Sequence, residues 1–324
     1  MTKQKVFLVG ATGETGSSIL EGLIEDGSFD ITCFVRTASA GKPAAQKLRD
    51  RGLKVVTGDF SGPTEETVAL LEGIDTIIGA FRAQSITDQI PLVTAAVQAG
   101  VKRFVPCNWA VPGARGGLMD ARDKKEEVHD YIFRDRLGFT IIDVGYWYEL
   151  SFPRVPSGKL DYAIAVPANE LYAGGTTPNM LIGKRDVGRI TAKIVRDERT
   201  LNKRVYAYGD LLSQNEVNAI VERKTGEKLE LKHVSADEIH ANIKAAEAAA
   251  EAGSTDLGAR YKLILSQYAN VKYVRGDNTP ENAEYLGYID GNALYPDFKF
   301  TKFEDFVDEL LAGKVTRPYA DMKF

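Results

Sequence analysis

The chain has 324 residues, of which 44% are hydrophobic and 27% are charged, a composition that excludes a disordered or collagen-like protein. Its length corresponds to roughly two globular domains. The formal net charge is −4, from 41 Lys and Arg against 45 Asp and Glu, and the cations are scattered along the chain. This charge pattern argues against nucleic acid as a partner.

Two further features indicate where the protein works. Cys33 and Cys107 are the two cysteines, too few for a disulfide framework, which predicts a reducing compartment. The N-terminus has only four strongly apolar residues, 6–9, before Gly10, which is too short for a signal-peptide core or a membrane span. We therefore expect a cytoplasmic protein without a membrane partner.

The first 150 residues alternate short apolar runs with amphipathic segments of helix length. Continuous apolar strands separated by helices indicate a parallel sheet that is covered on both faces. The fold class that we predict is α/β, a Rossmann-type doubly wound parallel sheet over residues 1–150. The expected strands are 6–9, 31–35, 54–56, 76–78, 103–106 and 139–142, and the expected helices are 17–24, 44–51, 65–71, 89–99 and 121–136.

Beyond residue 150 the alternation loosens, and prolines and the pair Gly174-Gly175 punctuate short segments. We expect residues 151–324 to form a smaller, loop-rich substrate-binding region, with a segment at about 183–212 that returns to the first domain. A helix is expected at 186–196. A second helix is expected at 236–252, with Ser235 as its N-cap and Glu238 completing a capping box.

A glycine-rich segment, Gly10-Ala11-Thr12-Gly13-Glu14-Thr15-Gly16, lies between the first strand and the first helix. Glycines at this place allow a tight turn and let a pyrophosphate approach the N–H groups of the helix N-terminus. The spacing is G-x-x-G-x-x-G and differs from the generic G-x-G-x-x-G pattern. Because the segment connects a strand to a helix at the start of repeated βα units, we predict a dinucleotide site.

The end of the second strand indicates which coenzyme binds. An NAD site usually has Asp or Glu there to accept a hydrogen bond from the ribose 2′-hydroxyl. This chain has Arg36 instead, with Lys42 a few residues further on. Cations attract a 2′-phosphate, whereas a carboxylate would repel it, so the sequence favours NADP over NAD.

A search for catalytic groups gives mostly negative results. Tyr-x-x-x-Lys, the acid–base pair of many short-chain dehydrogenases, occurs as Tyr268…Lys272, Tyr295…Lys299 and Tyr319…Lys323. We expect the first two pairs to be extended, where this spacing separates the side chains, and the third to lie in a poorly ordered chain end. The three histidines and two cysteines show no ligand spacing, so no metal is expected, and G-x-S-x-G is absent.

The helix expected at 121–136 carries Lys124, Lys125 and His129. His129 lies one turn after Lys125 and is expected to be a partly exposed helix histidine. From the residues alone, Lys125 is an ordinary helix lysine.

Short motifs in a fixed order resemble those of a family of atypical short-chain dehydrogenases. This family comprises the isoflavone, phenylcoumaran benzylic ether and pinoresinol-lariciresinol reductases with their fungal NmrA-like relatives. The resemblance covers nearly the whole chain and implies the Rossmann-type fold, a reductase activity and NADPH as coenzyme. The motifs lie at 10–16, 35–37, 57–60, 88–89, 100–104, 274–277 and 294–297.

The resemblance also implies roles for individual residues. The catalytic lysine of the family stands in a K-x-x-[VI] context before the sixth strand, which corresponds to Lys125, with Lys124 as the adjacent alternative. Arg36 and Lys42 would hold the 2′-phosphate, Phe60 would lie by the adenine, and residues 79–81 would pass the nicotinamide. The residues expected to contact the coenzyme are Gly10, Thr12, Gly13, Glu14, Thr15, Gly16, Arg36, Lys42, Asp59, Phe60, Ala80, Phe81, Gln89 and Lys125.

One departure from the family concerns the substrate. Where the plant reductases have Pro-Ser-Glu-Phe-Gly after the fifth strand, this chain has Pro106-Cys107-Asn108-Trp109-Ala110, which removes a charge and puts the plant substrates in doubt. Asn108 and the aromatic residues nearby are candidates for contacts with the substrate, with plain core packing as the alternative for the aromatic ones. The substrate candidates are Asn108, Trp109, Tyr146, Trp147 and Tyr148.

Two functions are compatible with these features. The first is an NADPH-dependent reductase that transfers a hydride to a small conjugated or aromatic substrate, an enone, a ketone or a quinone-methide-like compound, with Lys125 as general acid or base. The second is an NmrA-like regulator that senses NADP and binds a protein partner without chemistry, because a fold does not fix a function. The oligomeric state is expected to be a monomer or a homodimer.

Overall fold

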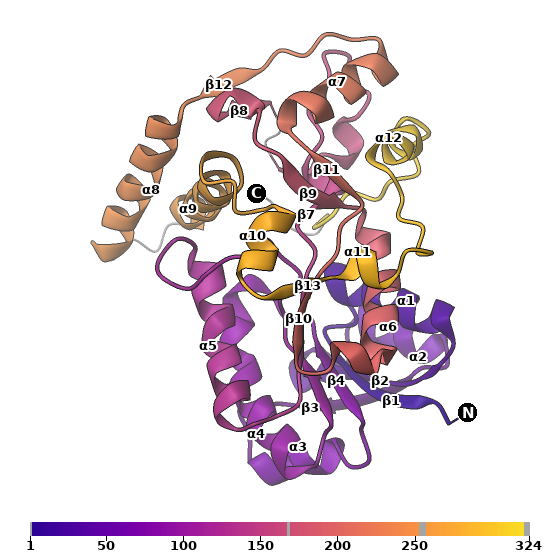
Figure 1. Cartoon of the computed structure of the whole chain (residues 1–324). Helices are drawn as coiled ribbons and strands as arrows, with labels where there is room; N and C mark the ends of the chain where they lie inside the picture. Colours follow the sequence, from indigo (N-terminus) through magenta and orange to yellow (C-terminus); the bar gives the residue numbers. More distant parts are fainter. Residues whose placement is uncertain (1, 167–168, 253–256, 321–324) are drawn as a thin grey trace.

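The computed structural model describes residues 2–166, 169–252 and 257–320 (Figure 1). An α/β unit built mainly from the first half of the chain occupies the lower part of Figure 1, and the loop-rich second half lies above it. The central sheet is parallel and has the strand order β3-β2-β1-β4-β5. Its strands are β1 (Gln4–Val9), β2 (Phe29–Arg36), β3 (Lys54–Gly58), β4 (Thr76–Gly79) and β5 (Arg103–Val105).

The predicted helices between these strands are confirmed, with ends that differ by a few residues. The helix expected at 89–99 is preceded by a 3₁₀ segment, η2 (Ala83–Gln89), and begins one residue later than expected. The helices of this unit are α1 (Glu14–Asp26), α2 (Pro43–Asp50), α3 (Thr64–Leu70), α4 (Ile90–Gln98) and α5 (Asp120–Arg134).

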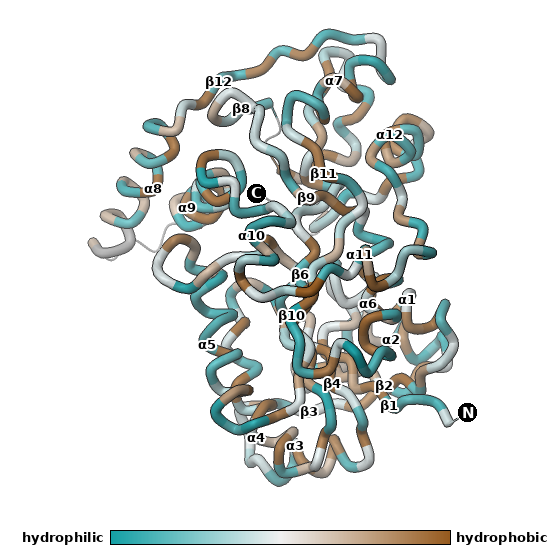
Figure 2. Tube along the Cα trace, viewed as in Figure 1, coloured by the Kyte–Doolittle hydropathy of each residue, from teal (hydrophilic) through white to brown (hydrophobic). Residues whose placement is uncertain are grey.

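The sheet is buried on both faces, as its continuous apolar strands predict. Successive residues of a strand point to opposite faces, and Phe7 and Leu8 of β1 accordingly belong to different hydrophobic clusters. Leu8 packs with Ile19 of α1, whereas Phe7 packs with Leu92 of α4. Figure 2 shows the central strands as hydrophobic and α5 as mostly hydrophilic.

The sixth predicted strand, β6 (Thr140–Asp143), exists but pairs mainly with later parts of the chain. It lies beside β10 (Lys203–Tyr206), which in turn pairs with β13 (Tyr288–Asp290), and both pairings are parallel. A single bridge between Phe104 and Phe139 connects these strands to β5. The sheet is therefore extended by strands from the second half of the chain.

Helix α6 (Lys184–Arg196) packs closely against α1. A Cβ at Gly22 would lie 2.2 Å from the carbonyl carbon of Gly188, and a Cβ at Gly188 would lie 1.8 Å from the main-chain oxygen of Ser18. The Ser18 hydroxyl donates to the carbonyl of Lys184 and accepts from the N–H of Gly188. Gly22 and Gly188 thus allow α1 and α6 to approach each other closely. This contact holds the segment after residue 183 against the first half of the chain.

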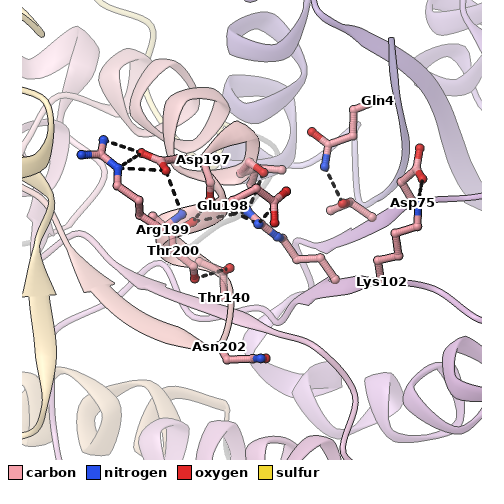
Figure 3. Close-up of polar contacts among 12 residues, drawn as sticks. Gln4, Asp75, Lys102, Thr140, Asp197, Glu198, Arg199, Thr200 and Asn202 are labelled. Atoms are coloured by element: carbon pink, nitrogen blue, oxygen red, sulfur yellow. Dashed lines mark hydrogen bonds and ion pairs between the residues drawn. The ribbon is translucent and has the colours of Figure 1, made fainter. Parts of the chain in front are cut away.

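The end of α6 is fixed by polar contacts to the strands (Figure 3). The buried guanidinium of Arg103 donates to the carbonyls of Val195 and Asp197 at 2.5 and 3.2 Å. The Thr140 hydroxyl donates to the carbonyl of Thr200 at 2.9 Å. These contacts fix the position at which the chain enters β10.

The C-terminal half is assembled from short elements, as predicted. It contains a three-stranded sheet in the order β11-β9-β7, a two-stranded pairing of β12 with β8, and an aromatic core around Tyr148, Phe303 and Phe306. Its elements are β7 (Tyr146–Trp147), β8 (Glu170–Tyr172), β9 (Asn179–Ile182), β11 (Asp210–Leu212), α7 (Gln214–Thr225), β12 (Lys232–Val234), α8 (Ala236–Glu251), α9 (Leu257–Ala269), the π-helical η7 (Asn270–Val274), α10 (Pro280–Tyr285), α11 (Gly291–Leu294) and α12 (Phe303–Leu311).

The start of α8 agrees with the prediction for its N-cap. The Ser235 hydroxyl accepts a hydrogen bond of 3.1 Å from the N–H of Glu238. The Glu238 carboxylate itself faces Lys232 at 3.4 Å. Among the helices in the described ranges, none has the length and apolar character needed to cross a membrane.

Candidate active site

The glycine-rich turn leaves bare main chain at the end of β1. Gly10 has a φ of +84°, and a Cβ on it would lie 2.0 Å from the carbonyl oxygen of Ala80. A Cβ on Gly16 would lie 1.9 Å from the carbonyl oxygen of Gly10. Gly13 is the N-cap of α1 and offers no side-chain bond, so N–H groups of the first helical turn are available to an anion. Thr12 and Gly13 are exposed and Thr15 is half-buried, which fits a turn that receives a pyrophosphate.

Two exposed cations lie at the end of β2 and at the start of α2. Arg36 is the last residue of β2 and Lys42 is the N-cap of α2. Both are exposed, and neither side chain forms a hydrogen bond or an ion pair within the described parts of the chain. The residues present therefore fit NADP better than NAD.

Aromatic side chains and an exposed carboxylate follow the next strand. Asp59 is exposed just after β3, and the Phe60 ring stacks on Phe34 with centroids 4.2 Å apart. Phe60 is half-buried and also contacts Phe81, with a centroid distance of 6.3 Å. This ring therefore retains accessible surface beside the turn.

Glu14 is occupied by other parts of the protein. One carboxylate oxygen accepts from Lys184 Nζ and the other accepts from the main-chain N–H of Tyr319 at 2.9 Å. Glu14 therefore connects the start of α1 to α6 and to the C-terminal segment, and its carboxylate already has partners.

The residues after β4 hold two loops together. Gln89 is buried, and its Oε1 accepts from the N–H of Cys107 at 2.8 Å. The N–H of Phe81 donates to Cys107 Sγ at 3.2 Å. Ala80 and Phe81 themselves are half-buried. The carboxyl ends of β4 and β5 thus meet at Cys107, the edge of the sheet at which Rossmann-type folds bind their ligands.

Lys125 faces this edge, whereas Lys124 is exposed. The Lys125 side chain is 7% exposed, and its Nζ donates to the carbonyls of Cys107 at 2.7 Å and Asn108 at 2.6 Å. An ammonium has three N–H donors, so one remains for a ligand. Burial lowers the pKa of Lys125, and the charge of Arg122 acts in the same direction.

The burial of His129 differs from the expectation. It was predicted to be partly exposed, but the structure buries it completely, with 0% of its surface exposed. His129 Nε2 donates to Asn108 Oδ1 at 3.0 Å, and Nδ1 lies 3.1 Å from a carboxylate oxygen of Glu126. Hydrogen bonds with these polar partners on α5 and on the loop after β5 make its burial possible, and helical periodicity does not reveal them.

The same network fixes the loop that surrounds Lys125. Asn108 Nδ2 donates to Asp143 at 3.0 Å, and Asp143 also accepts from Arg122 at 3.0 Å and from the Tyr288 hydroxyl at 2.6 Å. Burial opposes ionisation of Glu126, but bonds with His129 and Arg204 outweigh it and lower the pKa of this carboxyl. Asn108 is thus committed to the protein's own network.

The predicted aromatic walls differ in their surroundings. Trp109 is buried and its indole N–H donates to the carbonyl of Gly79 at 3.0 Å. Tyr148 is 0% exposed and its hydroxyl bonds to Asp210 and Thr301, so it belongs to the core of the C-terminal half. Trp147 stacks on Tyr319 with centroids 6.1 Å apart. Tyr146 is half-buried and is the one of this set that keeps substantial accessible surface.

The prediction of an extended segment at 268–272 is wrong. Tyr268 belongs to α9 and Lys272 to the π-helical turn that continues it. Gln267 bonds to Asp120, and Val271 packs with Val111 and Met119, so tertiary contacts with α5 and its preceding loop stabilise the helix. The segment 295–299 follows α11 without helical structure, and Lys323 lies outside the described residues.

A surface hollow of about 680 Å³ lies elsewhere, between α1, α6 and the segment 294–299. Apart from Lys299, its cations have carboxylate partners within the same hollow. Arg189 pairs with Glu25, and Arg199 pairs with Asp197, the latter contact being visible in Figure 3. An anionic ligand would therefore find few unpaired cations in this hollow. The candidate site remains at the glycine-rich turn and Lys125.

Comparison with known proteins assigns the chain to a family. A parallel sheet covered by helices, with a glycine-rich turn between its first strand and first helix, is the arrangement of Rossmann-type folds. The model of the NmrA-like family matches residues 2–307. The chain therefore belongs to the NmrA-like family, as the sequence motifs predicted.

Two relatives that match nearly the whole chain are named as a dehydrogenase and a reductase. The chain is 41% identical over 312 residues to asnovolin J 5′,6′-dehydrogenase nvfM of Aspergillus novofumigatus, with 95% of each chain covered. It is 26% identical to a probable pinoresinol-lariciresinol reductase 3 of Arabidopsis thaliana, with 95% and 98% covered. Its fold matches the binary complex of leucoanthocyanidin reductase with NADPH from Vitis vinifera with a TM-score of 0.78, at 22% identity over 95% and 99% of the two chains. The predicted Rossmann-type fold is thereby confirmed.

Proposed function

We propose that the protein is an NADPH-dependent oxidoreductase that transfers a hydride between the coenzyme and a carbon atom of a small conjugated or aromatic substrate. The observation that carries the proposal is Lys125, buried at the carboxyl edge of the sheet with one N–H donor unused by the protein. The names of the relatives, reductases of aromatic compounds and a dehydrogenase, support this reaction class.

The coenzyme would be held by the turn at 10–16, with Arg36 and Lys42 on its 2′-phosphate. When bound, it supplies or accepts the hydride. Solved structures that share the fold contain NADPH or NADP⁺, which supports this choice of coenzyme. We infer that residues 1–150 form the coenzyme-binding domain together with α6 and β10, which contact α1 and β6.

Lys125 would act on the oxygen of the substrate at which charge accumulates. Two of its N–H groups are fixed by main-chain carbonyls, so the third points in a defined direction and needs little reorganisation to donate to that oxygen. In the opposite direction, the neutral amine would accept a proton. General acid–base catalysis of this kind contributes about 100- to 10,000-fold to a rate.

The substrate would be the small-molecule partner, and the protein would act in the cytoplasm, where Cys33 and Cys107 would stay reduced. Both are free and buried. A monomer and a homodimer are both compatible with this function.

The experiment is a turnover assay with matched lysine variants. NADPH fluorescence is followed with a panel of phenolic enones, ketones and quinone-methide precursors, and NADP⁺ reduction with their reduced counterparts. We expect consumption with at least one compound, wild-type behaviour for Lys124→Met, and a loss of about 100-fold or more for Lys125→Met at unchanged NADPH affinity.

The outcome also separates the two candidate functions. Full turnover of Lys125→Met would contradict the role of this lysine. Tight NADPH binding without consumption of any compound, together with capture of a protein partner, would instead support a regulator that senses NADP.

A further inference from the structure

A second buried lysine lies in the C-terminal half. Lys272 belongs to η7 and is 3% exposed. Its Nζ lies 3.3 Å from the ring centroid of Tyr146 and 4.6 Å from that of Tyr273. The ammonium therefore rests on the faces of two aromatic rings, which attract a cation.

This ammonium lacks the partners that buried lysines normally have. The Lys272 ammonium forms no hydrogen bond and no ion pair with any residue in the described ranges. Lys125, buried to a similar degree, donates to two carbonyls. Buried charges are rarely left without an anion or acceptor, because desolvation of an ammonium costs several kcal/mol. The missing partner therefore needs an explanation.

The rings around Lys272 keep accessible surface although they lie deep in the molecule. Tyr146, Tyr268 and Tyr273 are each half-buried. Burial raises the pKa of all three hydroxyls. The Tyr146 and Tyr268 rings are tilted against each other with centroids 5.6 Å apart. The three tyrosine rings and the Lys272 ammonium thus form an aromatic cluster with accessible surface, which we call the Lys272 cluster.

The Lys272 cluster lies beside the loop that precedes α5. Tyr268 packs in one apolar cluster with Val111 and Met119, which flank the start of α5. Tyr268 thus connects the Lys272 cluster with the start of α5, the helix that carries Lys125.

We propose that Lys272 is a substrate-binding residue whose ammonium receives an anionic oxygen, a carboxylate, phenolate or enolate, at the end of the substrate remote from Lys125. The inference rests on the proposed function and names its substrate class, a flat aromatic or conjugated acid. The aromatic rings bind the flat body, and Lys272 distinguishes an acid from its neutral analogue.

The electrostatics of the Lys272 cluster support this role. Burial holds the pKa of Lys272 well below its usual value, so the protein alone stabilises the charge poorly. An anionic oxygen supplies the missing acceptor, and a charge-assisted hydrogen bond in a desolvated place is among the stronger polar contacts. Binding of an acid would therefore satisfy Lys272 and orient the ligand at the same time.

The test compares 2-naphthoate with its methyl ester, which has the same ring system and no charge. Both are titrated by calorimetry into the NADP⁺-loaded wild-type protein and into Lys272→Met, with Lys262→Met on the exposed side of α9 as matched control. We expect the wild type and Lys262→Met to bind the acid at least about tenfold more tightly than the ester. Lys272→Met should bind both equally and keep its affinity for NADP⁺.

Three results would overturn the inference: equal affinities in the wild type, no binding of 2-naphthoate, or a preference for the acid that survives in Lys272→Met. If Lys272→Met does not fold, Lys272→Gln is used with the same expectation. The NADP⁺ titration reports separately on the proposed function. Coenzyme binding without preference for the acid contradicts only the role of Lys272, whereas absence of coenzyme binding contradicts the proposed function.

Discussion

Lys125 of α5 donates a hydrogen bond of 2.7 Å from its ammonium to the main-chain carbonyl of Cys107, across a separation of 18 residues. The same Cys107 accepts from Phe81 through its thiol and donates to Gln89 through its N–H. The lysine is thus fixed to the junction of the loops after β4 and β5. Any displacement of these loops would change the direction of its remaining donor.

The pH dependence of turnover should report on Lys125. Burial lowers its pKa from the ordinary 10.5, so the ammonium is lost at a lower pH than in water. In the reductive direction, where the ammonium is the acid, kcat should fall as the pH rises through this lowered pKa. In the oxidative direction, where the amine is the base, kcat should rise over the same interval.

Lys125→Arg is the matched variant for this profile, because arginine stays protonated. It should be slower than the wild type and should lose the alkaline decrease of kcat in the reductive direction. The measurement is kcat between about pH 6 and 10.5 with the best compound of the panel. If the kcat of Lys125→Arg decreased at alkaline pH with the same pKa as that of the wild type, the titration would belong to another group.

The glycine-rich turn should tolerate a methyl group at one position and not at another. A Cβ at Gly16 would lie 1.9 Å from the Gly10 carbonyl oxygen, whereas a Cβ at Gly13 would lie at 3.4 Å from the same atom. Gly16→Ala should therefore distort the turn and weaken NADPH binding by about tenfold or more, with a lower melting temperature. Gly13→Ala should keep the wild-type melting temperature, and equal thermal unfolding of both variants would contradict the described turn.

Glu149 should make stability depend on pH. Burial raises its pKa to about 7, although hydrogen bonds from main-chain N–H groups, including that of Lys184 at the start of α6, oppose the shift. The folded pKa lies above the unfolded value, so the stability from this group is present below about pH 4.5 and is lost as the pH rises through 7. The full effect is roughly 3 kcal/mol at most.

Glu149→Gln removes this titration and keeps an acceptor for the N–H of Lys184. Its free energy of unfolding, relative to the wild type, should increase between about pH 5 and 8. Denaturant unfolding at both pH values measures the difference. A difference that is constant with pH, or that decreases, would show that Glu149 is ionised without penalty in the fold.

The N-terminal α/β unit was largely predictable because its signals are local. The run Val6 to Val9 is fully buried, and the glycine turn is dictated by contacts within a few residues and with one neighbouring strand. The pairing of β6 with β10 was not predictable, because it joins Ile142 to Val205 and no periodicity encodes a partner so far along the chain.

The environment of the candidate site was less predictable from the sequence. His129 and Asn108 are buried because they satisfy each other, which requires both α5 and the loop after β5 to be in place. Tyr268 and Lys272 show helical spacing, but the β-branched and aromatic residues around them favour a strand. The helix is stabilised by tertiary contacts of this segment with Asp120 and Val111. The Tyr-x-x-x-Lys spacing of these two residues is visible in the sequence, whereas their position beside Tyr146 depends on the tertiary structure.

The choice of coenzyme is tested most directly by calorimetry with NADPH and NADH, on the wild type and on Arg36→Ala, Lys42→Ala and the exposed control Lys47→Ala. We expect NADPH to bind the wild type and Lys47→Ala at least about tenfold more tightly than NADH, and we expect Arg36→Ala and Lys42→Ala to reduce that preference while NADH affinity stays unchanged. Equal affinity of the wild type for the two coenzymes, or no heat of binding with either, would contradict the account.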